Sequence, residues 1–226
     1  FTPQLHPETV RLQQHIDLEG APQVRTSFDG LTLLLAEEGT PDQPTRLRWF
    51  RRDGSQWTVE AMETEPCGSY CAVRVAVDGN FALAMIRTTA TLRAGVSPGR
   101  LLAFRRQGSA WQRVGDVSPP SADAGFELGV AMQLDHALVQ VQRPPLRGGI
   151  PAPDTAVASY RLDAGQWQFE SFLQIDQPGD LDDQSLGAAI VIDGNRALIG
   201  DPSAAASNGS VGAAYVFTRS NEGWVQ

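Results

Sequence analysis

The chain has 226 residues, of which 42% are hydrophobic, so it is long enough to bury a core and too apolar for a disordered segment. Its formal net charge of −8 and its pI of about 4.8 argue against a nucleic-acid-binding surface, which is usually basic. No window approaches the roughly 18 apolar residues of a membrane-spanning helix. The 22 Gly and 15 Pro, spread between many short apolar runs, favour an all-β chain rich in turns.

The first predicted element is a strand within residues 8–18. Apolar residues occupy alternate places in this segment, as in a half-buried strand, and it belongs to none of the repeats that follow. We expect it to act as an outer strand that joins the two ends of the chain and closes a ring. The alternative is that the chain is a piece of a longer ring.

Four copies of a thirteen-residue phrase follow, at 45–57, 99–111, 155–167 and 212–224. Each copy has an aromatic residue at its sixth place and ends in Trp: Phe50 and Trp57, Phe104 and Trp111, Tyr160 and Trp167, Phe217 and Trp224. A second marker precedes each phrase, at Asp29-Gly30, Asp78-Gly79, Asp135-His136 and Asp193-Gly194. Two markers in one register indicate repeated structural units. We therefore predict a single domain, 1–226, with units at about 21–66, 67–121, 122–180 and 181–226.

Each unit is expected to contain four strands. The first ends at the Asp-Gly turn and the second follows at once, since Asp, Gly and Asn tolerate the positive φ of a tight hairpin. The repeated phrase is the third strand, and the fourth begins at the Trp. The last unit stops too soon after Trp224 for a complete fourth strand, which the segment 8–18 would supply. Such antiparallel units are stable when they pack face to face around a ring, so the prediction is an all-β, four-bladed β-propeller closed by the N-terminal strand. The aromatic and Trp residues are expected to fill the space between blades.

The fourth unit resembles the FG-GAP repeat, the blade unit of integrin α-chain propellers and of many bacterial extracellular proteins. The resemblance rests on Leu186-Gly187, Asp193-Gly194-Asn195, Ile199-Gly200-Asp201-Pro202 and Ala214-Tyr215-Val216-Phe217; the other three units are degenerate. It implies a propeller fold and an extracellular setting. Calcium-binding members carry an acidic loop between the first two strands, because a hard cation needs several converging oxygens. The turn from Asp193 to Arg196 is too short for that loop, so no calcium site of the family type is predicted.

Two cysteines, Cys67 and Cys71, stand in a C-x3-C spacing without the second ligand pair of a zinc site. They form either a small-loop disulfide or two free thiols. A disulfide would indicate an oxidising compartment. We expect a secreted, periplasmic or cell-surface protein.

Other chemistry is sparse. Four carboxylates cluster before the fourth unit and are interpreted as a solvated acidic loop, with a cation site as the alternative: Asp176, Asp180, Asp182 and Asp183. His136 is expected in a turn with its ring partly exposed, and its adjacency to Asp135 is not evidence of a catalytic dyad, because neighbours on a strand point to opposite faces. No cofactor is predicted.

Three long connections join second to third strands, at 87–98, 143–154 and 201–211, and should gather on one rim. Loops on a rigid scaffold are frequent recognition sites. The candidate ligand-binding residues are arginines in these connections: Arg87, Arg93, Arg143 and Arg147.

The leading hypothesis is a non-enzymatic extracellular interaction module, monomeric if the ring is closed, that binds a protein or glycan through this rim. The first alternative is a hydrolase or lyase with an acidic site at the channel mouth. The second is a structural segment of a larger surface protein, which would have an open, sticky edge when made alone.

Overall fold

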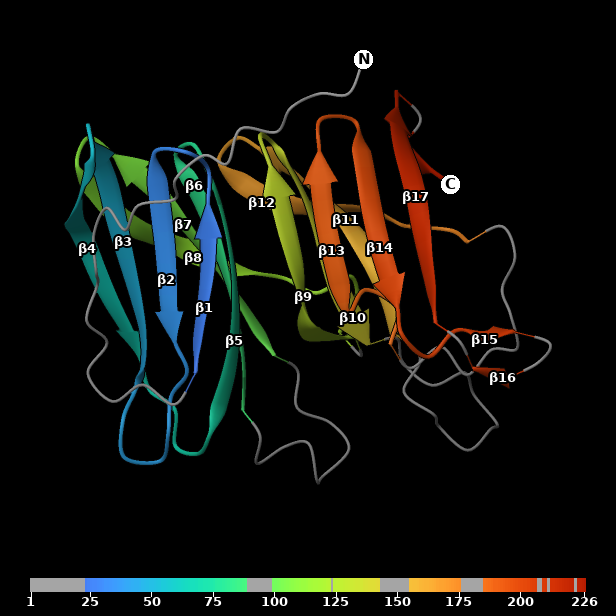
Figure 1. Ribbon diagram of the computed structural model, residues 1–226, viewed down its shortest axis with the longest axis horizontal. Helices are drawn as coiled ribbons and strands as arrows, with labels where there is room; N and C mark the ends of the chain where they lie inside the picture. Colours follow the sequence, from blue (N-terminus) through green and yellow to red (C-terminus); the bar gives the residue numbers. More distant parts are fainter. Residues whose placement is uncertain are drawn as a thin grey trace, which may run out of the picture.

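A computed structural model describes residues 23–88, 99–122, 124–142, 155–175, 185–206, 209–210, 212–221 and 223–226. These residues form strands and turns and no helix (Figure 1). They build four four-stranded antiparallel sheets, which follow one another along the chain. The protein is an all-β propeller with four antiparallel blades, as predicted.

Each sheet is a meander in chain order. Sheet 1 contains β1 (Val24–Phe28), β2 (Thr32–Glu37), β3 (Thr45–Asp53) and β4 (Gln56–Glu65). Sheet 2 contains β5 (Cys71–Asp78), β6 (Phe81–Thr88), β7 (Arg100–Gln107) and β8 (Ala110–Val117). Sheet 3 contains β9 (Gly125–Gln133), β10 (His136–Gln142), β11 (Thr155–Asp163) and β12 (Gln166–Phe172). Sheet 4 contains β13 (Ala189–Asp193), β14 (Arg196–Asp201), β17 (Ala213–Ser220) and β18 (Gly223–Val225). A small ribbon of β15 (Ala205–Ala206) and β16 (Gly209–Ser210) lies between β14 and β17.

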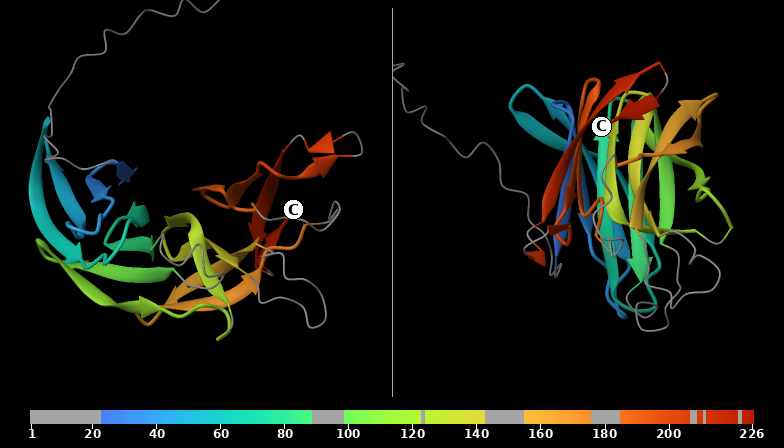
Figure 2. Two further views of the ribbon diagram at one scale, coloured as in Figure 1. Left: turned by 90° about the horizontal axis from the view of Figure 1, so that it is seen from below. Right: turned by 90° about the vertical axis from the view of Figure 1, so that its right-hand side faces the viewer.

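The four sheets lie along an arc, with sheet 1 at one end and sheet 4 at the other (Figure 2, left). Their first strands contact one another in succession, β1 with β5, β5 with β9 and β9 with β13. The predicted closing strand at 8–18 lies outside the described residues. The fourth strand of the last unit is short, as expected: β18 has three residues and pairs with β17 through Trp224 and Arg219.

The repeated aromatic residues of sheets 2, 3 and 4 fill the space between sheets, as predicted. Trp49 of sheet 1 lies 4.9 Å from Phe104 and 5.5 Å from Trp111 of sheet 2, measured between ring centroids. Tyr160 and Phe217, the sixth residues of the later phrases, are at most 1% exposed. Large rings at one repeated position bury enough apolar surface to hold neighbouring sheets together.

The hairpin between first and second strands departs from the prediction in sheet 3. Gly79 and Gly194 have positive φ, as expected for their turns. In sheet 3, however, Gln133 pairs with His136, so the turn is Leu134-Asp135, and Leu134 has φ 55°. Gln133 therefore occupies the position before the turn that Asp78 and Asp193 occupy in sheets 2 and 4. The sequence prediction placed Asp135, two residues later, at this position. His136 is not in the turn; it begins β10 and is only 8% exposed.

Candidate functional site

The junctions between neighbouring sheets differ at one repeated position. In β4, β8 and β12, the third residue after the repeated Trp lies at a β-bulge, where the register with the third strand shifts. The bulged residues are Glu60, Val114 and Glu170. A bulge redirects a side chain away from the regular alternation. This position therefore controls how each junction is filled.

Glu60 closes the junction between sheets 1 and 2. Its carboxylate accepts hydrogen bonds from Arg106 Nε at 2.9 Å and Trp111 Nε1 at 3.1 Å, and Arg106 Nη2 binds its other oxygen. Burial alone would raise the pKa of Glu60, but the hydrogen bonds from Arg106 and Trp111 outweigh it and lower that pKa. The carboxylate is therefore ionised at neutral pH and forms a charge-assisted contact across the junction.

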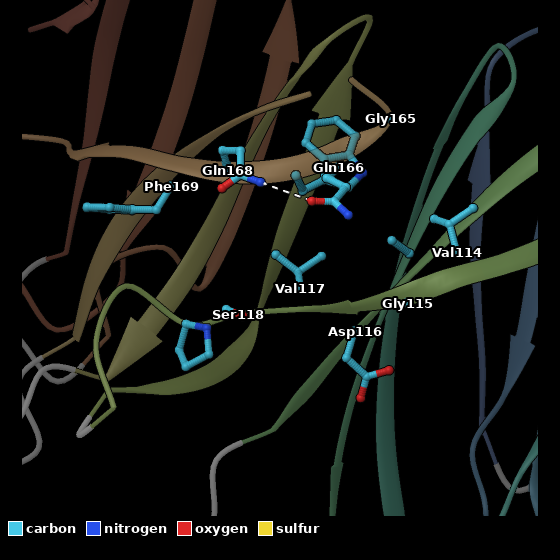
Figure 3. Close-up of a pocket in the computed structure, with 12 residues that line it drawn as sticks. Val114, Gly115, Asp116, Val117, Ser118, Gly165, Gln166, Gln168 and Phe169 are labelled. Atoms are coloured by element: carbon cyan, nitrogen blue, oxygen red, sulfur yellow. Dashed lines mark hydrogen bonds between the residues drawn. The ribbon is translucent and has the colours of Figure 1, made fainter. Parts of the chain in front are cut away.

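Val114 leaves the same position open between sheets 2 and 3. Here the residues that correspond to Arg106 and Trp111 are Leu162 and Trp167. Val and Leu side chains form no ion pair, because neither carries a charge. A groove of about 380 Å³ lies at this place between β8 and β12 (Figure 3).

The groove combines an aromatic ring with polar groups. Figure 3 shows Gln166, Gln168 and Phe169 on one strand and Asp116 on the other. The Phe169 side chain is 38% exposed, and Gln168 Nε2 donates to Gln166 Oε1 at 3.5 Å. Trp167 also lines the groove; it is 7% exposed, and its Nε1 hydrogen has no acceptor among the described residues. The groove thus offers an apolar surface, donors and acceptors together.

Three further contacts hold residues at or next to the groove in place. Asp116 binds Arg100 Nη2 at 2.9 Å and also pairs with Arg113. Partial burial opposes ionisation of Asp116, but these two arginines outweigh it and lower its pKa. The Tyr160 hydroxyl donates to the carbonyl of Ser118 at 3.0 Å, and burial raises the pKa of Tyr160, so the hydroxyl stays a donor.

A second cavity, of about 480 Å³, lies at the equivalent place between sheets 3 and 4 and is rich in charged groups. Glu170 and Arg219 line it and correspond in position to Glu60 and Arg106. Glu170 instead accepts a hydrogen bond from Ser159 Oγ at 2.9 Å. The junction therefore remains open although it has the residue types that close the first one.

His136 and Asp135 also line this second cavity, and the two side chains contact each other although sequence adjacency alone gave no evidence of a dyad. His136 Nε2 lies 3.0 Å from Asp135 Oδ1. Asp135 is in the turn, where the strand rule of opposite faces does not apply. Burial and the nearby Arg219 lower the pKa of His136, although Asp135 opposes the change. The ring is therefore neutral at pH 7, with its Nδ1 atom buried and without a partner in the described part of the chain.

Most of the sequence-predicted site residues fall outside the part of the chain that the structure describes. Arg93, Arg143, Arg147 and the acidic cluster Asp176, Asp180, Asp182 and Asp183 lie outside the described residues. Arg87 is described, at the end of β6, and forms an ion pair with Glu127 of β9, each side chain being at most 16% exposed. Whether the arginines bind a ligand stays a prediction. Cys67 and Cys71 form a disulfide, one of the two alternatives that the sequence left open.

Sequence reasoning missed both cavities. The available signal was the third residue after each repeated Trp, which changes from Glu60 to Val114 and back to Glu170. Among the described residues, no group of three or more His, Cys, Asp or Glu side chains is placed to hold a metal ion. The same part of the chain has no helix that is long and apolar enough to cross a membrane.

No protein-family model matches the chain, and no curated protein matches it either. Among solved structures, it is similar to a GH43 endo-arabinanase from Bacillus licheniformis, with 11% identity, 88% of this chain and 74% of that chain covered, and a TM-score of 0.42. It is also similar to a β-1,2-mannobiose phosphorylase from Listeria innocua in complex with β-1,2-mannobiose, with 9% identity, coverage of 84% and 55%, and a TM-score of 0.40. With identities this low, function has to be inferred from the residues of this chain.

Proposed function

We propose that this protein is an extracellular binding module that takes up a saccharide in the groove between β8 and β12. The observation that carries the proposal is the exposed ring of Phe169 beside the Gln166 and Gln168 amides. A sugar ring has an apolar C–H face and several hydroxyls, so it needs an aromatic surface with donors and acceptors around it. The groove volume, about 380 Å³, falls within the usual range for small ligands.

The lining of this groove favours binding over hydrolysis. A glycosidase normally places two carboxyl groups roughly 5 to 9 Å apart around the scissile bond. Asp116 is the one carboxylate among the described residues that line the groove. Its two arginine partners hold it ionised, so it is unsuited to act as a general acid.

The extracellular setting is part of the proposal. The Cys67–Cys71 disulfide supports it, because such bonds persist mainly in oxidising compartments. The FG-GAP-like phrases of the fourth unit support it as well, since the resemblance implies an extracellular propeller. Binding of a protein partner through Arg143 and Arg147 stays a prediction, and loss of such binding on alanine replacement of both would be its test.

The test of the groove is titration of neutral oligosaccharides by calorimetry against the whole chain. Phe169→Ala should weaken saccharide binding about fivefold, because stacking on an exposed ring is worth about 1 kcal/mol. Val114→Glu should abolish binding, since it restores the acceptor that Glu60 provides in the first junction and fills the groove. Phe28→Ala, which removes another exposed ring in sheet 1, is the matched control. Equal affinities for the Phe169 and Phe28 variants would refute the assignment of the groove.

A hydrolase remains the second candidate, because Asp135, His136 and Glu170 line one cavity. In this mechanism one carboxyl group protonates the leaving oxygen while the other removes a proton from the attacking water. Release of reducing sugar from a glycan panel, lost in Glu170→Gln and kept in Val114→Glu, would support it. Absence of turnover with glycans that bind in calorimetry would leave the binding module as the function.

A further inference from the structure

One face of each sheet is buried against the next sheet, except in sheet 4. The face is marked by neighbouring residues of the second and third strands, Leu34 with Trp49, Leu83 with Ala103, and Leu138 with Ser159. All six are at most 4% exposed. The same place in sheet 4 holds Leu198 and Val216, which are 47% and 57% exposed. Sheet 4 therefore presents to solvent a face that the repeat normally covers.

The exposed residues of sheet 4 are contiguous. Val191 pairs with Leu198, and Leu198 pairs with Val216, so the three side chains form a row across β13, β14 and β17. Paired side chains on one face of a sheet lie about 5 Å apart. Val191 and Val225 are 59% and 55% exposed. We call Val191, Leu198, Val216 and Val225 the sheet 4 face.

Sheet 1, at the other end of the arc, has an apolar face that no preceding described sheet covers. In sheet 2, Val77, Ala82 and Phe104 form the face that packs on sheet 1 and are at most 4% exposed. The register places Phe28, Leu33 and Phe50 at the same positions in sheet 1. Phe28 is 55% exposed, and Val59 and Met62 on β4 are 60% and 62% exposed. We call Phe28, Val59 and Met62 the sheet 1 face.

Each junction also contains a hydrogen bond between hairpins. The Gly79 N–H donates to Asp29 Oδ2 at 2.9 Å, the Leu134 N–H to Asp78 Oδ2 at 2.5 Å, and the Gly194 N–H to Gln133 Oε1 at 2.5 Å. The acceptor position is the residue that precedes the turn, and the donor is the first residue of the next sheet's turn. Asp193 is the corresponding acceptor in sheet 4, and Gly30 is the corresponding donor in sheet 1. The two outer faces thus match in hydrogen bonding as well as in apolar surface.

We infer that the sheet 4 face of one copy of this protein docks against the sheet 1 face of a second copy. The three junctions within the chain define what covers the sheet 4 face: a sheet with apolar residues at the Phe28 position and a donor at the Gly30 position. Sheet 1 has both. Within one chain the two faces lie at opposite ends of the arc (Figure 2, left), so the described sheets of a single copy do not cover them. The contact is head-to-tail and repeats until it closes a ring or extends as a series of copies.

The first experiment is the mass of the full chain in solution by analytical ultracentrifugation over a range of concentrations. Association that rises with concentration is expected for the unmodified protein. Leu198→Arg and Phe28→Arg should each weaken it tenfold or more, since a charge then faces an apolar surface. Leu134→Arg is the matched control, because Leu134 is 72% exposed but belongs to neither face. Circular dichroism and the unfolding midpoint establish that each variant is folded.

Mixing the two variants gives the sharper result. Each variant alone has one damaged face, so every pairing of identical copies is impaired. In the mixture, the intact sheet 4 face of the Phe28→Arg chain meets the intact sheet 1 face of the Leu198→Arg chain, and a heterodimer forms. A heterodimer confirms the head-to-tail contact. A monomer at all concentrations, association that Leu198→Arg leaves unchanged, or a mixture that stays monomeric overturns the inference.

Discussion

Removing the Glu60 carboxylate tests whether its contact with Arg106 and Trp111 stabilises the junction between sheets 1 and 2. Glu60→Ala leaves the Arg106 guanidinium and the Trp111 N–H without their acceptor between two sheets. Breaking a fully buried ion pair costs about 3 to 5 kcal/mol. The Glu60 and Arg106 side chains keep 10% and 18% exposure, so water recovers part of that loss. We therefore expect the free energy of unfolding to fall by about 2 to 3 kcal/mol.

The assay is urea unfolding followed by Trp fluorescence, with Val114→Ala as the control at the equivalent bulge of sheet 2. The effect should depend on pH. Because the folded-state pKa of Glu60 lies below its ordinary value of 4.5, its contribution is complete above pH 4.5. It is lost as the pH falls through the folded-state pKa. The difference in the free energy of unfolding between wild type and Glu60→Ala should therefore decrease at low pH. A loss below about 0.5 kcal/mol at pH 7, the range of ordinary surface substitutions, would refute the junction model.

Three further predictions follow from other contacts. His136 has a folded-state pKa below 6.5, so stability should fall as the pH drops below 6.5; unfolding midpoints at pH 7.5 and 5.5 should differ less in His136→Gln than in wild type. Reduction of the Cys67–Cys71 disulfide should cost about 2 kcal/mol, as expected for a five-residue loop, and denaturant titration with and without dithiothreitol checks this. Tyr160→Phe removes the hydrogen bond to the Ser118 carbonyl and should lower the free energy of unfolding by about 1 kcal/mol; an unchanged chemical-denaturation midpoint would show that water replaces the hydroxyl.

The groove between β8 and β12 and the charged cavity between sheets 3 and 4 are variants of one junction. Glu60 binds Arg106 across the first junction, Val114 lines the groove at the second, and Glu170 and Arg219 line one cavity at the third. A single repeated position thus converts a structural contact into a space that a ligand can occupy. Functional variation on a repeat scaffold commonly arises in this way, because the strands preserve the frame while one side chain changes.

Local sequence patterns were sufficient to predict most of the strands. The alternation of apolar and polar residues and the repeated Trp located the sheets, and Gly79 and Gly194 have the positive φ that their turns require. The same reasoning failed at His136, because Leu134 adopts a left-handed conformation that no local rule assigns to leucine. Because Gln133 pairs with His136, the turn consists of Leu134 and Asp135 and not of Asp135 and His136. In this turn the Asp135 carboxylate lies against the His136 imidazole.

The sequence by itself determined the four units, their strand order and the aromatic residues that join them, because these depend on spacing along the chain and on burial at a fixed period. Only the tertiary structure decided which sheet faces which and how each junction is filled. Trp111 and Trp167 are equivalent in the repeat, yet the Trp111 N–H donates to Glu60, whereas the Trp167 N–H is buried and has no acceptor among the described residues. That difference depends on a residue contributed by the preceding sheet. A sequence pattern within one unit does not indicate which side chain of another unit will contact it. The two exposed end faces likewise depend on how the sheets are arranged in space.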